Sequence, residues 1–350
     1  MSKKINLQLI FVVGTLIVFG LLFLTTLSAP ASLNELGTAN YYIVHQILYG
    51  LLPGLFLCFV AYKIPLGFIR KVAPFLILAN LAVMCLIFLP VIGSGFWGAK
   101  RWLNMGFFIF QPSEFLKISA ILYLAALISG KLSEDQKRGW ILAVKKGYDD
   151  LKQVFIPFVI FLIVLAIILI LQPDVSTLGI ISLTLLAMYF SVRTPFWHVP
   201  MLMTVGALGL AILIKIEPYR LQRLLIFLHP ETDPLGTGYQ IKQSLIALGS
   251  GGLFGKGLGM SSQKFGFLPA AMSDSVFPII GEELGIIGCT IVIGLFLFFL
   301  WSGINVARKS NDKFAQLTAL GITFWITIQA FVNISSAMGV FPLAGIPLPF

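Results

Sequence analysis

Long apolar segments, separated by shorter polar ones, run through the whole chain. Nine of them are each close to the roughly 20 residues that a helix needs to cross the hydrocarbon core of a bilayer. They span residues 7–27, 43–61, 72–92, 112–130, 153–171, 175–192, 196–214, 277–301 and 314–338. The pattern predicts an all-α fold, a polytopic membrane bundle in a single domain, 1–350. Because the first segment is longer than the roughly 7–15 apolar residues of a signal peptide, we expect it to remain as an anchor.

The composition supports a membrane protein and fixes its expected orientation. Hydrophobic residues make up 58% of the chain and charged residues only 11%, with a mean hydropathy of +0.96, whereas soluble domains carry about 25% charged residues. Most of the 24 lysines and arginines fall in short loops that lie in the cytoplasm if the N-terminus is inside, as the positive-inside rule requires. The net charge of +10 therefore predicts no nucleic-acid partner. The cysteines and histidines show neither disulfide nor zinc spacing.

One long polar segment, residues 215–276, separates the seventh and eighth predicted spans. Loops longer than about 12–15 residues are usually functional or disordered, and this one is too apolar for disorder. We expect short helices that lie on the outer membrane surface, with Arg220 and Arg223 one turn apart. The loop is predicted to be extracytoplasmic and to carry the active site, with a decorated surface loop as the plainer alternative.

Asp274 is the candidate catalytic residue of this loop. It lies just before a span that enters from the outside and beside a lysine-containing, glycine-rich stretch. A carboxylate in this position suits a general base that accepts a proton from a hydroxyl nucleophile. The alternative is that Asp274, Ser273 or Ser275 only caps the following helix.

The glycine run GSGGLFGKGLG, before Asp274, matches neither a Walker loop nor the dinucleotide fingerprint. Its backbone amides could face an anion, although this signal is weak alone. Glu282 and Glu283 lie about two turns beyond Asp274, where they could orient helices or tune the site.

A second candidate consists of charges inside the fourth span. Glu114 and Lys117 are three residues apart in QPSEFLKIS, so they share a helical face and can pair. Each charge costs about 2.5–3.5 kcal/mol at the centre of a membrane helix on insertion scales. The pair is either a structural link between helices or part of a polar cavity open to the outside. Asp174, in LQPDVST, is better interpreted as a helix cap.

Several of these stretches together resemble the SEDS family (shape, elongation, division and sporulation) of peptidoglycan glycosyltransferases. The resemblance covers nearly the whole chain and rests on GAKRWLNMG, QPSEFLKI, LQPDVSTLG, the run from YRLQRLLIF to FGKGLG, FLPAAMSDSVFPIIGEELG and the terminal GIPLPF. The GxGxSSQK and GEELG motifs are closer to the division-type FtsW branch than to RodA.

The resemblance implies ten helices and the polymerisation of lipid II at the outer face of a bacterial cytoplasmic membrane, for septal wall synthesis. RodA-type elongation is the alternative within the family. The family's essential acid falls on Asp274, which would deprotonate the acceptor sugar while a polyprenyl diphosphate leaves. A divalent ion (Mg²⁺ or Mn²⁺) without a known ligand set and a class B penicillin-binding transpeptidase partner are also implied. The candidate substrate-binding residues are Arg101, Glu114, Lys117, Arg220, Arg223, Lys242, Gln243 and Lys264.

The chain departs from the family pattern at two places. The family has Pro-Glu-x-His-x-Asp before its eighth helix, whereas this chain reads PAAMSD over residues 269–274, so that the companion Glu and His are missing. The family also continues beyond the PLPF motif into a tenth helix, so the sequence is expected to be truncated.

Two rival functions remain open at this point. A lipid II flippase would need access from both faces of the membrane, whereas the polar residues concentrate on the outer face. A non-catalytic scaffold for the transpeptidase would not need Asp274.

Overall fold

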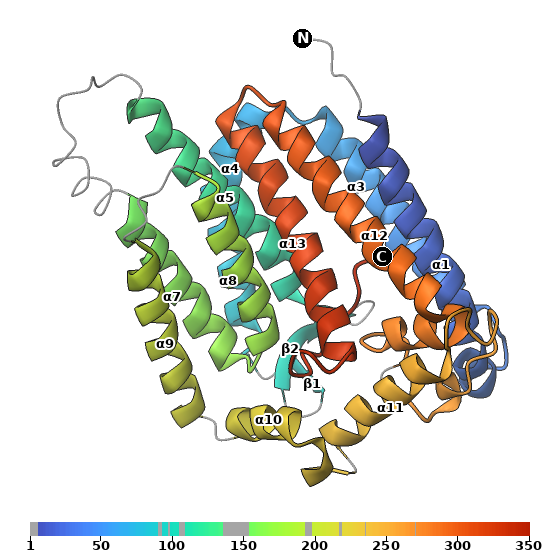
Figure 1. Cartoon of the computed structure of the whole chain (residues 1–350). Coiled ribbons are helices and arrows are strands. Elements are labelled where there is room, and N and C mark those ends of the chain that lie inside the picture. The colour runs from blue at the N-terminus through green and yellow to red at the C-terminus, as the bar shows by residue number, and fades with distance from the viewer. Residues whose placement is uncertain are drawn as a thin grey trace. The chain divides into compact units, whose positions relative to one another are not determined.

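The computed structural model describes residues 6–89, 93–96, 99–104, 109–135, 154–192, 198–216, 219–234, 236–269 and 271–350. The regular secondary structure of these residues is helical, apart from one small sheet (Figure 1). In the first half of the chain the helices are α1 (Leu7–Leu36), α2 (Tyr41–His45), η1 (Gln46–Leu51), α3 (Leu52–Lys63), α4 (Leu66–Leu86) and α5 (Pro112–Asp135). In the second half they are α7 (Ile156–Leu171), α8 (Val175–Phe190), α9 (His198–Ile216), α10 (Tyr219–Leu228), η3 (Pro230–Thr232), α11 (Thr237–Ser250), η4 (Gln263–Phe265), α12 (Val276–Arg308) and α13 (Lys313–Ala337).

Each of the nine predicted spans coincides with helical residues in the described part of the chain. Within the residues that the structure describes, seven stretches are long and apolar enough to cross a membrane: Leu7–Asn34, Tyr41–Lys63, Leu66–Leu86, Pro112–Gly130, His198–Lys215, Val276–Arg308 and Lys313–Ala337. The helices α7 and α8 are apolar but only 16 residues long, which is about 24 Å against a hydrocarbon core of about 30 Å. The predicted all-α polytopic bundle is confirmed, and the count of nine spans stays a prediction.

A small antiparallel sheet follows α4, where no strand was predicted. Its strands are β1 (Gly93–Phe96), β2 (Ala99–Asn104) and β3 (Ile109–Phe110), in the order β1-β2-β3. The register shifts between Ser94 and Gly95, where a bulge interrupts the pairing. Neither β1 (GSGF) nor β2 (AKRWLN) shows the alternation of apolar and polar positions that reveals a strand in a sequence.

The chain packs as two compact units. One unit comprises residues 64–213 and 304–325. Within it α4 packs against α5, and α8 packs against both α5 and α7. Its core is made of aliphatic and aromatic side chains from these helices and from the start of α13, including Leu116, Leu124, Phe158, Leu185, Tyr189 and Phe314.

The other unit comprises residues 1–63, 214–303 and 326–350. Its core joins α1, α12, the end of α13 and the segment after it, including Phe23, Phe277, Phe296, Ala330 and Leu348. The helices α10 and α11 also belong to this unit and contact one another. They confirm that the long loop contains short helices, and their position on the membrane surface stays a prediction. The expectation of a single domain also stays a prediction.

Candidate functional site

Asp274 lies in the turn that leads into α12, and hydrogen bonds from α11 and α13 hold this turn. The amide of Asn333, on α13, donates to the main-chain carbonyl of Asp274 at 2.8 Å. Gln240, on α11, donates to Ser275 Oγ at 3.3 Å, and this hydroxyl donates in turn to the carbonyl of Pro269 at 2.9 Å. The turn that carries the candidate base is therefore fixed on both sides of Asp274.

The surroundings of the Asp274 carboxyl suit a base. Burial raises its pKa above the ordinary value of 3.8, and a hydrogen bond from Ser273 partly offsets this rise. Among the described residues, the hydrogen bonds found for Asp274 are those to Ser273 and, through its carbonyl, to Asn333. A half-buried carboxylate with a raised pKa is a stronger proton acceptor than an exposed one.

The helix α12 is broken at Gly285, whose φ of +69° lies outside the helical region. In a continuous helix the amides of Ile286 and Ile287 would bond to the carbonyls of Glu282 and Glu283. They donate instead to the carbonyls of Gly252 and Leu253, at 3.0 and 3.3 Å.

The glycine run completes this exchange of partners. The amides of Lys256 and Gly257 take up the two carbonyls that the break releases, at 2.9 and 3.0 Å. A Cβ on Gly255 would lie 2.1 Å from the carbonyl oxygen of Glu283, so only glycine permits this approach. The glycine run therefore docks on α12, and the four backbone groups that the break releases all have partners. We call residues 251–265 the docked segment.

The Glu282 carboxylate, on α12, lies at the centre of the side-chain contacts between α12 and the docked segment. It is fully buried and pairs with Lys256 at 2.7 Å, where the lysine side chain is 39% exposed. Both the hydroxyl and the amide of Ser262 donate to it, as do the Ser261 hydroxyl and the Gln263 amide. The main-chain amides that face this carboxylate belong to Ser262 and Gln263, just after the glycine run, whereas Lys256 and Gly257 of the run donate to main-chain carbonyls. Anion binding by the glycine run itself stays a prediction.

Glu283 and Lys264 form a second buried pair in the same segment. Their charged atoms lie 3.4 Å apart, and the Lys264 ammonium also donates to the carbonyl of Gly259. The lysine side chain is only 5% exposed, so the geometry gives Lys264 a structural role. Its predicted contact with a diphosphate stays a prediction without support from this arrangement. The loop beside Asp274 is also less cationic than its sequence indicates, because Glu282 and Glu283 neutralise two of its lysines.

The predicted pair of Glu114 and Lys117 is present at the start of α5. Lys117 Nζ lies 2.7 Å from Glu114 Oε1, with the lysine side chain 2% exposed and the glutamate side chain 48% exposed. The ammonium also lies 5.5 Å from the centre of the Trp325 ring, within the range of a cation–π contact.

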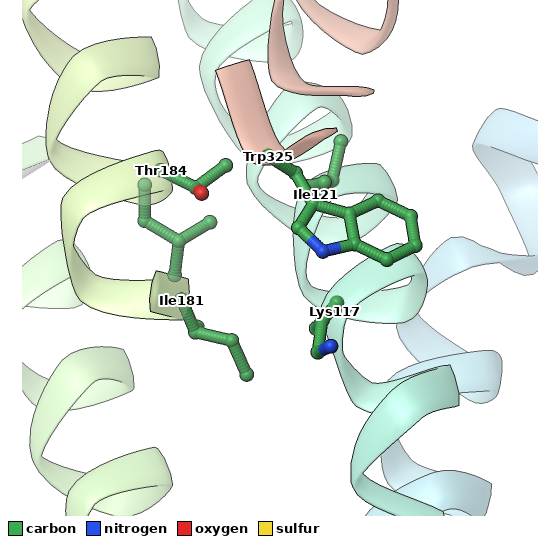
Figure 2. A pocket seen from close by; sticks show the side chains of 6 residues that line it. Lys117, Ile121, Ile181, Thr184 and Trp325 are labelled. Atoms are coloured by element: carbon green, nitrogen blue, oxygen red, sulfur yellow. The ribbon is translucent and has the colours of Figure 1, made fainter. Parts of the chain in front are cut away.

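Lys117 and Trp325 line a narrow crevice with Ile121, Ile181, Thr184 and Leu185 (Figure 2). The crevice has no room for a water molecule. Removal of Glu114 would therefore leave the Lys117 ammonium poorly solvated.

We expect the two charges to compensate for one another in stability measurements. Because Glu114 is half exposed, Glu114→Gln should cost about 2 kcal/mol of unfolding free energy, between the values for surface and buried pairs. Lys117→Met should cost less, since the carboxylate left behind is hydrated, and the double variant should recover part of the Glu114→Gln loss. Thermal unfolding in detergent measures this coupling. Strictly additive losses would contradict it.

A second polar network in the same unit joins the sheet to the turn between α7 and α8. Arg101, on β2, donates to the main-chain carbonyls of Gln172 and Pro173. Asp174 is the N-cap of α8, as predicted, because its carboxylate accepts from the Thr177 amide at 3.3 Å. It also accepts from the Ser113 hydroxyl at 3.2 Å. Arg101 is thus engaged with backbone carbonyls, and its contact with substrate stays a prediction.

The remaining candidate residues lie on α10 and α11. Arg223 and Lys242 are exposed and Gln243 is half buried. Arg220 shares α10 with Arg223, one turn away as predicted, and its side chain lies outside the described residues. Substrate binding by any of these four residues stays a prediction.

Two residues of α13 that the sequence analysis did not single out take part in the site. Gln329 and Asn333 donate side-chain hydrogen bonds to the C-terminal segment, and Asn333 also contacts the Asp274 turn. The available signal was two amide side chains four residues apart in an otherwise apolar span. Polar side chains inside a membrane helix mark functional positions by default.

The implied divalent ion finds no protein site in the described residues. They bring together no group of three or more His, Cys, Asp or Glu side chains that could hold a metal ion. We therefore derive no step of the reaction through Mg²⁺ or Mn²⁺.

Comparisons with known proteins decide the family. The FtsW/RodA/SpoVE family model, described as a cell cycle protein, matches residues 7–350. The chain belongs to this family. The FtsW/RodA/SpoVE assignment confirms the resemblance drawn from the motifs, and the protein is a multi-pass protein of the cytoplasmic membrane.

Two relatives are similar along almost their whole length. A probable peptidoglycan glycosyltransferase FtsW from Coxiella burnetii is 36% identical over 339 residues, covering 96% of this chain and 87% of that protein. Stage V sporulation protein E from Bacillus subtilis is 34% identical over 351 residues, covering 100% and 92%.

Two solved structures share the fold. A chain of a peptidoglycan synthase complex that coordinates polymerization and crosslinking has a TM-score of 0.77 at 23% identity, with 99% of this chain and 91% of that chain covered. The rod shape determining protein RodA from Thermus thermophilus has a TM-score of 0.68 at 22% identity, with 99% and 90% covered. The helical fold of the FtsW/RodA/SpoVE family is therefore present in this chain.

Proposed function

We propose that this chain is a peptidoglycan glycosyltransferase that polymerises lipid II at the outer face of the cytoplasmic membrane. The observation that carries the proposal is Asp274, a half-buried carboxyl in a turn that is hydrogen-bonded to α11 and α13. Two relatives named probable peptidoglycan glycosyltransferase FtsW support it. They are the Coxiella burnetii protein and a Nitrosococcus halophilus protein that is 35% identical and covers 90% of this chain. Their name also favours a septal role over elongation.

In the proposed reaction Asp274 acts as the general base. Its carboxylate takes the proton from the acceptor sugar hydroxyl, and the hydroxyl oxygen forms a bond to the anomeric carbon of the donor sugar. The bond between this carbon and the diphosphate oxygen breaks, and the polyprenyl diphosphate leaves with the electron pair. Exposed cations stabilise the negative charge that develops on the leaving diphosphate. Arg223 and Lys242 are the described candidates for this role.

The outer loop also suits a lipid-linked substrate. Large apolar side chains are exposed along the docked segment, namely Leu253, Phe254, Leu258, Met260 and Phe265. Side chains of this kind favour the membrane interface or a polyprenyl chain over water. The division into a buried polar centre around Glu282 and an apolar outer face lets one loop contact both the protein and a lipid.

A partner of the penicillin-binding transpeptidase class belongs to the same proposal. One structure with the same fold is a chain of a peptidoglycan synthase complex that coordinates polymerization and crosslinking. A glycan polymerase without a transpeptidase produces uncrosslinked strands, so a partner of this class completes the wall.

The test is an assay of the purified chain with lipid II in sealed vesicles, scored both for glycan polymer on a gel and for lipid translocation. The proposal expects polymer and no translocation. Translocation without polymer would identify a flippase. If neither polymer nor translocation is observed, the result would favour the non-catalytic scaffold. Lipid II at the outer face alone should be sufficient for polymer formation.

The acid side of the pH–rate profile should report the Asp274 carboxyl. Because a general base acts when ionised, the rate should fall as the pH drops through the raised pKa of Asp274. Ser273→Ala removes a hydrogen bond that lowers this pKa, so the acid limb should move to higher pH with little change in the plateau rate. Polymerisation rates over a pH series check this shift. A limb that stays in place or moves to lower pH would count against the assignment.

A further inference from the structure

The segment that follows α13 lies directly beside Asp274. A Cβ placed on Gly345 would lie 3.6 Å from Asp274 Oδ2, and Gly345 adopts a φ of +60°, in the left-handed region that favours glycine. Further along, the Phe350 ring lies between Phe19 of α1 and Phe296 of α12, with ring centres 6.3 and 6.0 Å away. The segment is thus anchored in the core of its unit and forms one wall of the Asp274 site.

One side chain connects this wall to the turn that carries the base. The amide nitrogen of Asn333 donates to the carbonyl of Asp274 at 2.8 Å and to the carbonyl of Ile346 at 2.7 Å. Asn333 is 3% exposed, so neither bond competes with water. Its Oδ1 accepts no hydrogen bond from the described residues. The side chain therefore serves as a two-fold donor, and a residue of equal shape without donors cannot replace it.

We propose that Asn333 is a positioning residue for glycosyl transfer, because its amide clamps the Asp274 turn to the Gly345–Ile346 wall. The inference rests on the proposed function. It adds the residue that fixes the orientation of the Asp274 carboxylate. Asn333 touches main-chain atoms alone, so it acts through Asp274 and not on the substrate. Loss of the clamp should misplace the base without removing it.

The test compares substitutions on the same helix. Asn333→Asp keeps the shape of the side chain but replaces the donating Nδ2 by an oxygen. This oxygen faces the two carbonyl oxygens and cannot donate to both of them. We expect kcat for lipid II polymerisation to fall about 10²-fold, the cost of a misplacement of about 1 Å, while KM stays near that of the unmodified chain. Asn333→Ala removes the donor without adding a charge and should show the same fall in kcat.

Thr327→Val is the matched control. Thr327 is a buried polar residue of α13 whose hydroxyl has no hydrogen-bond partner in the described residues. Its replacement by valine should leave kcat unchanged. All variants are compared at equal amounts of folded protein, measured by size-exclusion chromatography.

A positional role is separated from a merely structural one by a double variant. If Asn333 acts through Asp274, Asn333→Ala combined with Asp274→Asn should be no slower than Asp274→Asn alone, because residues that act as a unit are not additive. Full kcat in both Asn333 variants would overturn the proposal, as would losses that multiply in the double variant.

Failure of the proposed function has a different signature. In that case the unmodified chain yields no polymer, or Asp274→Asn retains the full rate, whatever the Asn333 variants do. A chain that polymerises, loses its rate in Asp274→Asn and keeps its rate in both Asn333 variants would overturn the clamp alone.

Discussion

Glu282→Ala is expected to lower the free energy of unfolding by about 3 kcal/mol, the lower end of the range for a broken buried ion pair. The lower end applies because Lys256 is 39% exposed and can be hydrated after the change. The larger part of the cost comes from the loop, where the buried residues Ser261 and Gln263 lose the acceptor that satisfies them. Buried donors left without a partner bear their full desolvation penalty.

The loss should be localised in the docked segment. Hydrogen exchange of the amides between residues 251 and 264 should increase, while α5 and α8 keep their protection, because the regions of a protein open with different free energies. Glu231→Gln is the control, since this acid is exposed in the same long loop. If Glu282→Ala unfolds at the same temperature as the control and its loop exchanges no faster, the carboxylate does not hold the loop.

The sequence predicted the features that depend on neighbours along the chain. The helical segments follow from runs of apolar residues, the Glu114–Lys117 pair from a spacing of three, and the Asp174 cap from the residues that begin α8. Each of these is decided within one or two turns of helix, so periodicity and spacing contain the necessary information.

The features that were missed depend on contacts between distant segments. The docking of the glycine run requires the break at Gly285, and the two segments are about 30 residues apart in the sequence. The pattern indicates only that glycines are present and not which backbone they approach. Lys264 is a second example. Its pairing with Glu283 is not visible in the sequence, so the sequence predicts that this lysine contacts the diphosphate of the substrate.

Asp274→Asn should reduce the rate of lipid II polymerisation by roughly 10²–10⁴-fold, the usual contribution of a general base. Asparagine keeps the size of the side chain and its ability to accept a hydrogen bond, but it is not a basic carboxylate. The main-chain bond from Asn333 to residue 274 is unaffected by this change. Protein yield and lipid II binding should therefore remain near those of the unmodified chain.

The alternatives give different results for the same variant. Asparagine caps a helix as well as aspartate does, so a capping role predicts an unchanged rate. A flippase predicts translocation that survives the substitution and no polymer even from the unmodified chain. The Glu and His that the family places before this acid are replaced here by Ala270 and Met272, so no neighbouring residue of that motif could take over as the base.

The most direct measurement is the ratio of initial polymerisation rates of the unmodified chain and Asp274→Asn, with lipid II in the same vesicles at the same pH. Glu231→Gln, purified in parallel, controls for the loss of an exposed carboxylate in the same loop. The account predicts a ratio of at least about 10² for Asp274→Asn and a ratio near one for Glu231→Gln. A ratio near one for Asp274→Asn, with polymer formed by both proteins, would contradict the assignment of Asp274 as the general base.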